Sequence, residues 1–139
     1  MRRLAPLLLA LSLAVPGCGS PTQVLTEVTL GEPFDLEVGN VAMLRDQQLS
    51  IRFLSVLEDS RCPTDSLILC IWAGRVRLRL AVAPLSGDEA FVELHFGDDP
   101  TAVTLGTLRL ELLDVLPPAR TETIPPGDYT AQLVLTAVR

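Results

Sequence analysis

The sequence predicts an all-β protein: an antiparallel, immunoglobulin-like β-sandwich with one disulfide inside a loop. Three observations favour this class. Apolar and polar residues alternate with a period of two along several segments. Clusters of Gly, Pro, Asp and Ser separate those segments at short intervals, as in sandwiches. Two cysteines are left to pair once a third is assigned to the N-terminal signal. No segment keeps helical periodicity for more than about two turns.

The clearest strand is predicted from Arg75 to Ala83, where Val and Leu alternate with Arg. In the segment from Leu108 to Val115 the alternation slips at Leu112-Leu113, and the slip predicts a β-bulge. The well-patterned segments are 49–57, 75–83, 90–96, 108–115 and 129–137, and the weaker ones are 24–30, 34–38, 41–44 and 67–72.

A tyrosine near the C-terminal end adds a packing prediction. Ile124-Pro-Pro-Gly-Asp-Tyr129 resembles the tyrosine corner of immunoglobulin-like domains, in which the hydroxyl holds the approaching loop. We therefore expect the Tyr129 hydroxyl to make a buried hydrogen bond.

Composition limits the function. The chain has 139 residues, which favours one domain, and 48 % of them are hydrophobic but only 4 % aromatic, so the core is mainly Leu, Val, Ile and Ala. The net charge is −6. Loss of Arg2 and Arg3 with a signal peptide brings it to about −8. An acidic chain without lysine is a poor ligand for nucleic acid, which requires clustered cations.

The N-terminus reads as a lipoprotein signal peptide over residues 1–17. The apolar run from Leu4 to Val15 would span about 18 Å as a helix, too short for a ~30 Å hydrocarbon core. Val15-Pro-Gly-Cys18 resembles the bacterial lipobox, which implies a diacylated Cys18 at the mature N-terminus. The alternative is an ordinary secretory peptide with an incidental cysteine.

These features predict the domain organisation and the location. A lipid-anchored tether over residues 18–26 would precede a β-sandwich domain over residues 27–139. The expected location is the bacterial cell envelope, with the membrane as a partner through the N-terminal lipid. Gly19, in place of the Asp that retains lipoproteins at the inner membrane, favours the outer membrane of a Gram-negative cell.

Lipidation of Cys18 leaves Cys62 and Cys70, which we expect to form a disulfide in an oxidising compartment. Fully extended, the segment between them would be about 26 Å long, whereas bridged Cα atoms lie within roughly 7 Å. The segment must fold back, and Pro63 to Ser66 are turn formers. A metal site is the alternative, but the spacing of two cysteines and a distant His95 does not match zinc motifs.

One stretch resembles a known family. Asp59-Ser-Arg-Cys-Pro63, followed by Cys70-Ile-Trp-Ala-Gly74, resembles a family of small exported or lipid-anchored bacterial proteins of unknown function. Their pattern is Asp-Ser-Arg-Cys-Pro, a gap, then Cys-x-Trp-Ala-Gly. Leu30 to Phe34 and the final strand after Asp128 fit the same family. The resemblance covers most of residues 28–139 and implies no activity.

The disulfide loop is the best candidate site. It carries Asp59, Arg61, Asp65 and Trp72, and a stapled loop would bind with a low ordering cost. In the structural alternative, Asp59 caps the turn, Arg61 pairs with a carboxylate and Trp72 packs on the disulfide.

The second candidate is the arginine row on the strand over residues 75–83, formed by Arg75, Arg77 and Arg79. The row could bind an anionic surface, but pairing with acids such as Glu93 or Glu111 is the simpler expectation. His95 is expected to be solvated. Gly97 to Pro100 offers too few oxygens for calcium, so we predict no metal and no cofactor.

The sequence favours a non-enzymatic envelope module, because it contains no catalytic motif that we identify. Its partner would be an envelope protein or a polysaccharide. The alternative is an inhibitor of an envelope or extracellular hydrolase that presents the Cys62–Cys70 loop. A hydrolase of unknown type is a third, weaker hypothesis.

Overall fold

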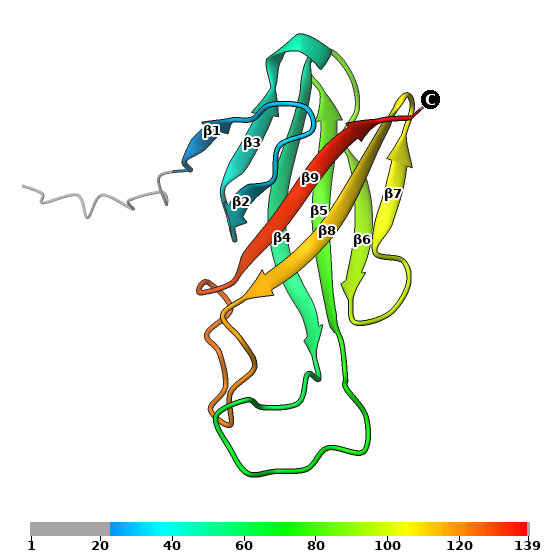
Figure 1. Cartoon of the computed structure of the whole chain (residues 1–139). Helices are drawn as coiled ribbons and strands as arrows, with labels where there is room; N and C mark the ends of the chain where they lie inside the picture. Colours follow the sequence, from blue (N-terminus) through cyan, green and yellow to red (C-terminus); the bar gives the residue numbers. More distant parts are fainter. Residues whose placement is uncertain (1–22, 139) are drawn as a thin grey trace, which may run out of the picture.

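The computed structural model describes residues 23–138, which form two packed β-sheets and a single turn of 3-10 helix (Figure 1). The predicted signal peptide and Cys18 lie outside the described residues. The elements are β1 (Leu25–Glu27), β2 (Phe34–Glu37), β3 (Val41–Leu44), η1 (Arg45–Gln47), β4 (Leu49–Asp59), β5 (Val76–Pro84), β6 (Ala90–Phe96), β7 (Ala102–Leu105), β8 (Leu108–Leu116) and β9 (Thr130–Ala137).

One sheet has the order β1-β3-β4-β5-β6 and the other has the order β2-β9-β8-β7. Consecutive strands from β3 to β6, and from β7 to β9, pair antiparallel with their neighbours. The short β1 is parallel to β3, and it begins at Leu25, within the range expected to be a tether. The prediction of an all-β sandwich with one disulfide in a loop is confirmed.

The core lies between the two sheets and is mainly aliphatic. In β9 every second residue is buried, as the alternating pattern predicts, and β5 buries Val76, Leu78 and Leu80 completely. Phe53 on β4 is the largest fully buried side chain. Such burial is worth about 1.5 to 3 kcal/mol for each large aliphatic or aromatic side chain.

The bulge predicted in β8 is confirmed. The register with β9 shifts between Leu112 and Asp114, so Leu113 faces outward while Leu112 and Val115 both reach the core.

One local prediction was wrong, and one strand was missed. The segment 67–72 is not a strand, because it projects beyond both sheets and its backbone has no neighbouring strand to pair with. Strand β7 was not predicted, although Ala102 to Leu105 is followed by Gly106 in a left-handed conformation, the mark of a tight hairpin turn. Over residues 23–138 the structure contains no helix that is both long and apolar enough to cross a bilayer.

Candidate functional site

The loop between β4 and β5, residues 60–75, forms one end of the molecule beside the connection from β8 to β9 (Figure 1). We call it the stapled loop. At its base, Arg61 donates through Nε and Nη2 to the two carboxylate oxygens of Asp59, at 2.9 and 2.8 Å. The two side chains are only 10 % and 14 % exposed. Arg61 also donates to the carbonyl oxygens of Val115 at 2.6 Å and Pro117 at 3.0 Å. The guanidinium therefore ties the loop to the opposite sheet.

Tyr129 completes this buried cluster. Its hydroxyl donates to Asp59 Oδ2 at 3.1 Å and so joins the start of β9 to the end of β4. The hydroxyl is buried and hydrogen-bonded as predicted, but its acceptor is a carboxylate of the other sheet and not the loop that precedes it. Burial raises the pKa of Tyr129, and the negative charge of Asp59 adds to that rise.

The carboxylate of Asp59 stays ionised. Burial by itself raises the pKa of Asp59, but the hydrogen bonds and positive charge of Arg61, with the Tyr129 hydroxyl, outweigh burial and bring the pKa below its ordinary value. The expectation that Arg61 pairs with a nearby carboxylate is confirmed. Asp59 also accepts the Arg61 backbone N–H at 3.2 Å, which caps the turn.

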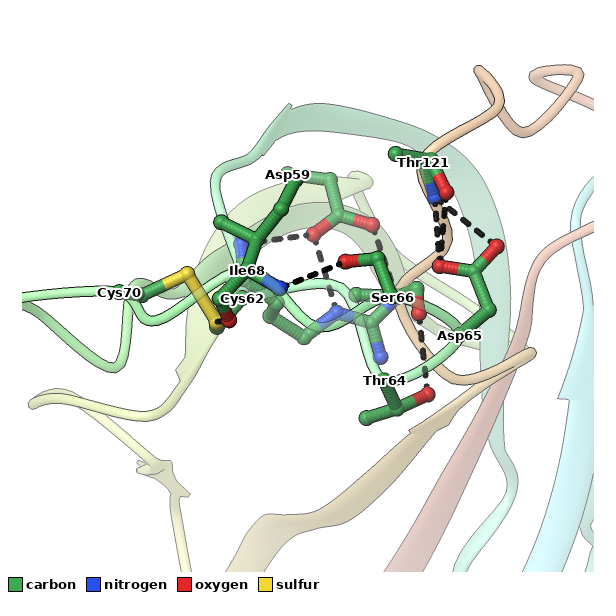
Figure 2. The surroundings of a disulfide bond; sticks show 10 residues. Asp59, Cys62, Thr64, Asp65, Ser66, Ile68, Cys70 and Thr121 are labelled. Carbon is green, nitrogen blue, oxygen red and sulfur yellow. Dashed lines mark hydrogen bonds and ion pairs between the residues drawn. A yellow bond between two sulfur atoms is a disulfide. The ribbon is translucent and has the colours of Figure 1, made fainter.

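A second set of bonds fastens the loop to the β8–β9 connection (Figure 2). The backbone N–H and the hydroxyl of Thr64 both donate to the carbonyl of Ala119, at 3.0 and 3.1 Å. Asp65 accepts from the backbone N–H and the hydroxyl of Thr121, both at 2.9 Å. These Thr121 hydrogen bonds lower the pKa of Asp65.

The disulfide and one glycine close the loop. Cys62 and Cys70 are bonded with their Cα atoms 5.9 Å apart, as predicted (Figure 2). The two ends of the loop pair through Cys62 N–H to Ala73 O at 3.1 Å and Ser60 N–H to Arg75 O at 2.8 Å. Gly74 has φ +70°, and a Cβ there would overlap the Ser60 carbonyl. Glycine is therefore required for the two chains to approach this closely.

The tip of the loop is apolar and exposed, in contrast to the charged and largely buried base. Leu67, Leu69 and Ile71 are almost fully exposed, Trp72 is 83 % exposed, and Ile68 is about half-exposed. No charged residue occurs between Ser66 and Gly74. We call the five apolar residues the apolar tip. Soluble surfaces usually scatter such residues singly, whereas a contiguous group marks an interaction site.

The position of Trp72 corrects one expectation. In the structural alternative, Trp72 packs on the disulfide, as it would if residues 67–72 were a strand, since residues two apart in a strand share a face. The segment is not a strand, and the indole lies in solvent instead.

Several depressions flank the loop base, and two of them involve the residues described above. One of about 380 Å³ is mainly apolar and lies between the loop and the ends of β6 and β8, with Ala73, Phe96 and Val115 in its wall. The other, of about 210 Å³, is polar and is lined by Asp59, Arg61 and Tyr129, whose polar groups already bond one another.

The arginine row is neutralised by acids, as expected. Arg75 contacts Glu58 at 3.4 Å and Asp98 at 2.8 Å, and Arg77 also approaches Glu58 at 3.4 Å. The Glu93 partner predicted for the row binds Arg79, at 2.9 Å. The other predicted acid, Glu111, lies 3.6 Å from Arg109 instead. The row therefore offers little uncompensated positive charge for an anionic surface.

His95 is not simply solvated, contrary to expectation. Its side chain is 14 % exposed and Nδ1 lies 2.9 Å from Asp98 Oδ1. Asp98 lies between His95 and Arg75, and the hydrogen bond from Arg75 is the main cause of its lowered pKa. Within residues 23–138 no group of three or more His, Cys, Asp or Glu side chains is placed to hold a metal ion.

The structure divides the four predicted loop residues by role. Asp59, Arg61 and Asp65 are engaged in bonds within the protein, whereas Trp72 is 83 % exposed and takes part in none of these bonds. Sequence reasoning missed the other members of the apolar tip. The sequence signal for them is a charge-free apolar run inside a closed disulfide loop, a pattern that also fits a strand.

Comparison of the chain with known protein families, with curated proteins and with solved structures finds no match.

Proposed function

We propose that this chain is a cell-envelope lipoprotein, anchored through Cys18, whose β-sandwich is a non-enzymatic binding module. The stapled loop is its binding element. One observation carries the proposal: five large apolar side chains are exposed together on a loop whose base is fixed by a disulfide, a buried ion pair and bonds to the neighbouring connection. A pre-organised loop loses little conformational entropy on binding.

The lipid anchor is tested by mass. Mature protein extracted from bacterial membranes should begin at Cys18 and carry the mass of its acyl chains. Each buried methylene contributes about 0.8 kcal/mol to membrane attachment, so two or three chains anchor the protein stably. A Cys18→Ser variant is the control and should stay unprocessed or leave the membrane. An unmodified mass for the wild-type protein would contradict the anchor.

The binding role is tested by photo-crosslinking in cells. Amine-directed reagents are unsuitable because the chain contains no lysine. A photoreactive amino acid in place of Leu69, at the apolar tip, should give a crosslinked product. The matched control replaces Leu85, which is also exposed but lies in the turn after β5, at the other end of that strand. Equal products from both positions, or none from Leu69, would contradict a binding role for the loop.

A second candidate is an inhibitor of an envelope or extracellular hydrolase. The observation that favours it is the exposure of Leu67 and Leu69 within a loop closed by a disulfide, since a protruding, fixed segment can occupy an enzyme cleft. Assays against a panel of proteases and lysozymes test it. Absence of inhibition at micromolar protein would reject this candidate and leave the binding module.

A further inference from the structure

We propose that the apolar tip inserts into the lipid bilayer that holds the N-terminal anchor, so that the protein has two membrane contacts. This inference rests on the proposed lipidation of Cys18 and names the ligand of the stapled loop as a lipid surface. Two features of the molecule support it: the composition of the tip, and the direction and reach of the chain that enters the sandwich. The charge around the loop then indicates which lipids the tip would enter.

The composition of the tip suits the membrane interface. Leu67, Ile68, Leu69 and Ile71 supply aliphatic surface, and Trp72 is the indole that is enriched where hydrocarbon meets headgroups. The loop that carries the tip projects beyond the ends of the strands (Figure 1). A fluid bilayer accepts a projection without a shaped counterpart, whereas a protein partner would need a matching cleft.

The direction of β1 allows the anchor to lie on the loop side. β4 runs toward the stapled loop and ends at Asp59, and β3 is antiparallel to β4. β1 is parallel to β3, so it runs away from the loop, and the chain enters the sheet from the loop side. The entry point is level with the middle of β4, because Asn40 bonds both Val24 and Phe53.

The reach of the preceding chain matches the distance to the loop. From Phe53 to Asp59 the strand covers about 20 Å at 3.3 Å per residue. From Val24 back to Cys18 the chain can extend by about 20 Å. A lipid on Cys18 can therefore lie level with the loop base, and the apolar tip, which extends beyond Asp59, then meets the same membrane surface.

The charge around the loop indicates how the tip binds. At the loop base Arg61 is paired with Asp59, and Arg75 with Glu58 and Asp98. Beside the loop, Asp65 accepts from Thr121, and the neighbouring Arg120 and Glu122 carry opposite charges, so this end of the molecule gains no net positive charge. The protein as a whole is acidic, with a net charge of −6. Attraction to anionic headgroups therefore contributes little, and we expect insertion into uncharged phosphatidylcholine with little dependence on salt.

The test uses Trp72, which is the only tryptophan in the chain and therefore reports on the tip alone. Lipidated mature protein, verified by mass, is reconstituted into phosphatidylcholine vesicles with ordinary or acyl-brominated lipid. We expect the brominated lipid to quench Trp72 strongly and aqueous iodide to quench it weakly. A Leu67→Ser/Leu69→Ser variant should reduce quenching by brominated lipid about threefold or more, because the tip loses much of its apolar surface.

The matched control is Leu85→Ser/Phe91→Ser, which removes two exposed apolar side chains away from the loop. Its quenching should equal that of the wild-type protein. Unchanged circular dichroism and thermal unfolding will show that both double variants are folded.

The possible failures are distinguishable. Wild-type Trp72 that remains open to iodide, in protein whose lipid is verified, would overturn membrane insertion and leave the lipoprotein proposal intact. Crosslinks from position 69 to one protein and not to lipid would also overturn membrane insertion and leave the lipoprotein proposal intact. They would identify a protein ligand of the tip. An unmodified mass at Cys18 would overturn both proposals.

Discussion

The base and the tip of the stapled loop reverse the usual distribution of residues. At the base, the charged side chains of Asp59 and Arg61 are largely buried. At the tip, a few residues along the chain, the aliphatic side chains of Leu67 and Leu69 are almost fully exposed. Burial of a charge is tolerated only with complete pairing, whereas exposure of a single leucine destabilises the fold little. The base therefore stabilises the fold, and the exposed tip is the surface to which we assign the proposed contact outside the chain.

The largest expected effect comes from breaking the base. Arg61→Met leaves the Asp59 carboxylate buried without its partner and removes the bonds to two carbonyls of the other sheet. We expect a loss of about 3 kcal/mol in the free energy of unfolding, measured by urea denaturation. Arg45→Met is the matched control, because the Arg45–Glu27 pair is mostly exposed and should contribute less than about 1 kcal/mol. Equal losses in the two variants would show that the Asp59–Arg61 pair contributes no more to stability than an exposed ion pair.

Removal of the disulfide should cost slightly less. The Cys62→Ser/Cys70→Ser variant opens a small loop, and the loop-entropy relation gives about 2.5 kcal/mol. Urea denaturation of the double variant, with reduced wild-type protein for comparison, measures the loss. Because the bonds of Thr64 and Asp65 to the neighbouring connection remain, we expect the sandwich to stay folded. No loss of stability would mean that those bonds alone fix the loop.

Acid should weaken the base selectively. The pKa of Asp59 in the folded protein lies below its ordinary value of 3.8, so the ionised carboxylate stabilises the fold above that pH. This contribution is lost as the pH falls through the folded pKa. We expect the stability difference between the wild-type protein and Asp59→Asn to be full at neutral pH and to shrink below about pH 4. A constant difference from pH 7 to pH 2, measured by thermal unfolding, would contradict this.

A smaller effect is expected for the hydroxyl of Tyr129. Tyr129→Phe removes one hydrogen bond to Asp59 but leaves the buried ring and the Asp59–Arg61 pair in place. The expected loss is about 1 kcal/mol, measured by urea denaturation. A double-mutant cycle with Asp59→Asn should show coupling, since both variants break the same bond. Additive losses would show that the Tyr129 hydroxyl stabilises the fold through a contact other than its bond to Asp59.

The smallest effect on stability is expected at the tip. Leu69→Ser exchanges an almost fully exposed side chain for a polar one, so the free energy of unfolding should change by less than about 0.5 kcal/mol. Thermal unfolding checks this expectation. A loss above about 1 kcal/mol would show that the tip supports the fold and would remove the reason to regard it as a binding surface.

The alternation of apolar residues along the chain was sufficient to predict most of the strands, the bulge at Leu112-Leu113 and the core residues, because these follow from the period of two in an extended backbone. The same rule failed at residues 67–72. Apolar, β-prone residues form a strand only when another strand can accept their backbone hydrogen bonds, and none lies beside this segment.

The sequence by itself therefore determined the fold class, the pairing of Cys62 with Cys70 and the location of the candidate site in the disulfide loop. Only the tertiary structure decided what each loop residue does. Val115, Thr121 and Tyr129 are far from the loop along the chain. Their contacts with Arg61, Asp65 and Asp59, respectively, show that these three loop residues support the fold. The exposure of the apolar tip was also decided by the tertiary structure, because the loop extends beyond the ends of both sheets.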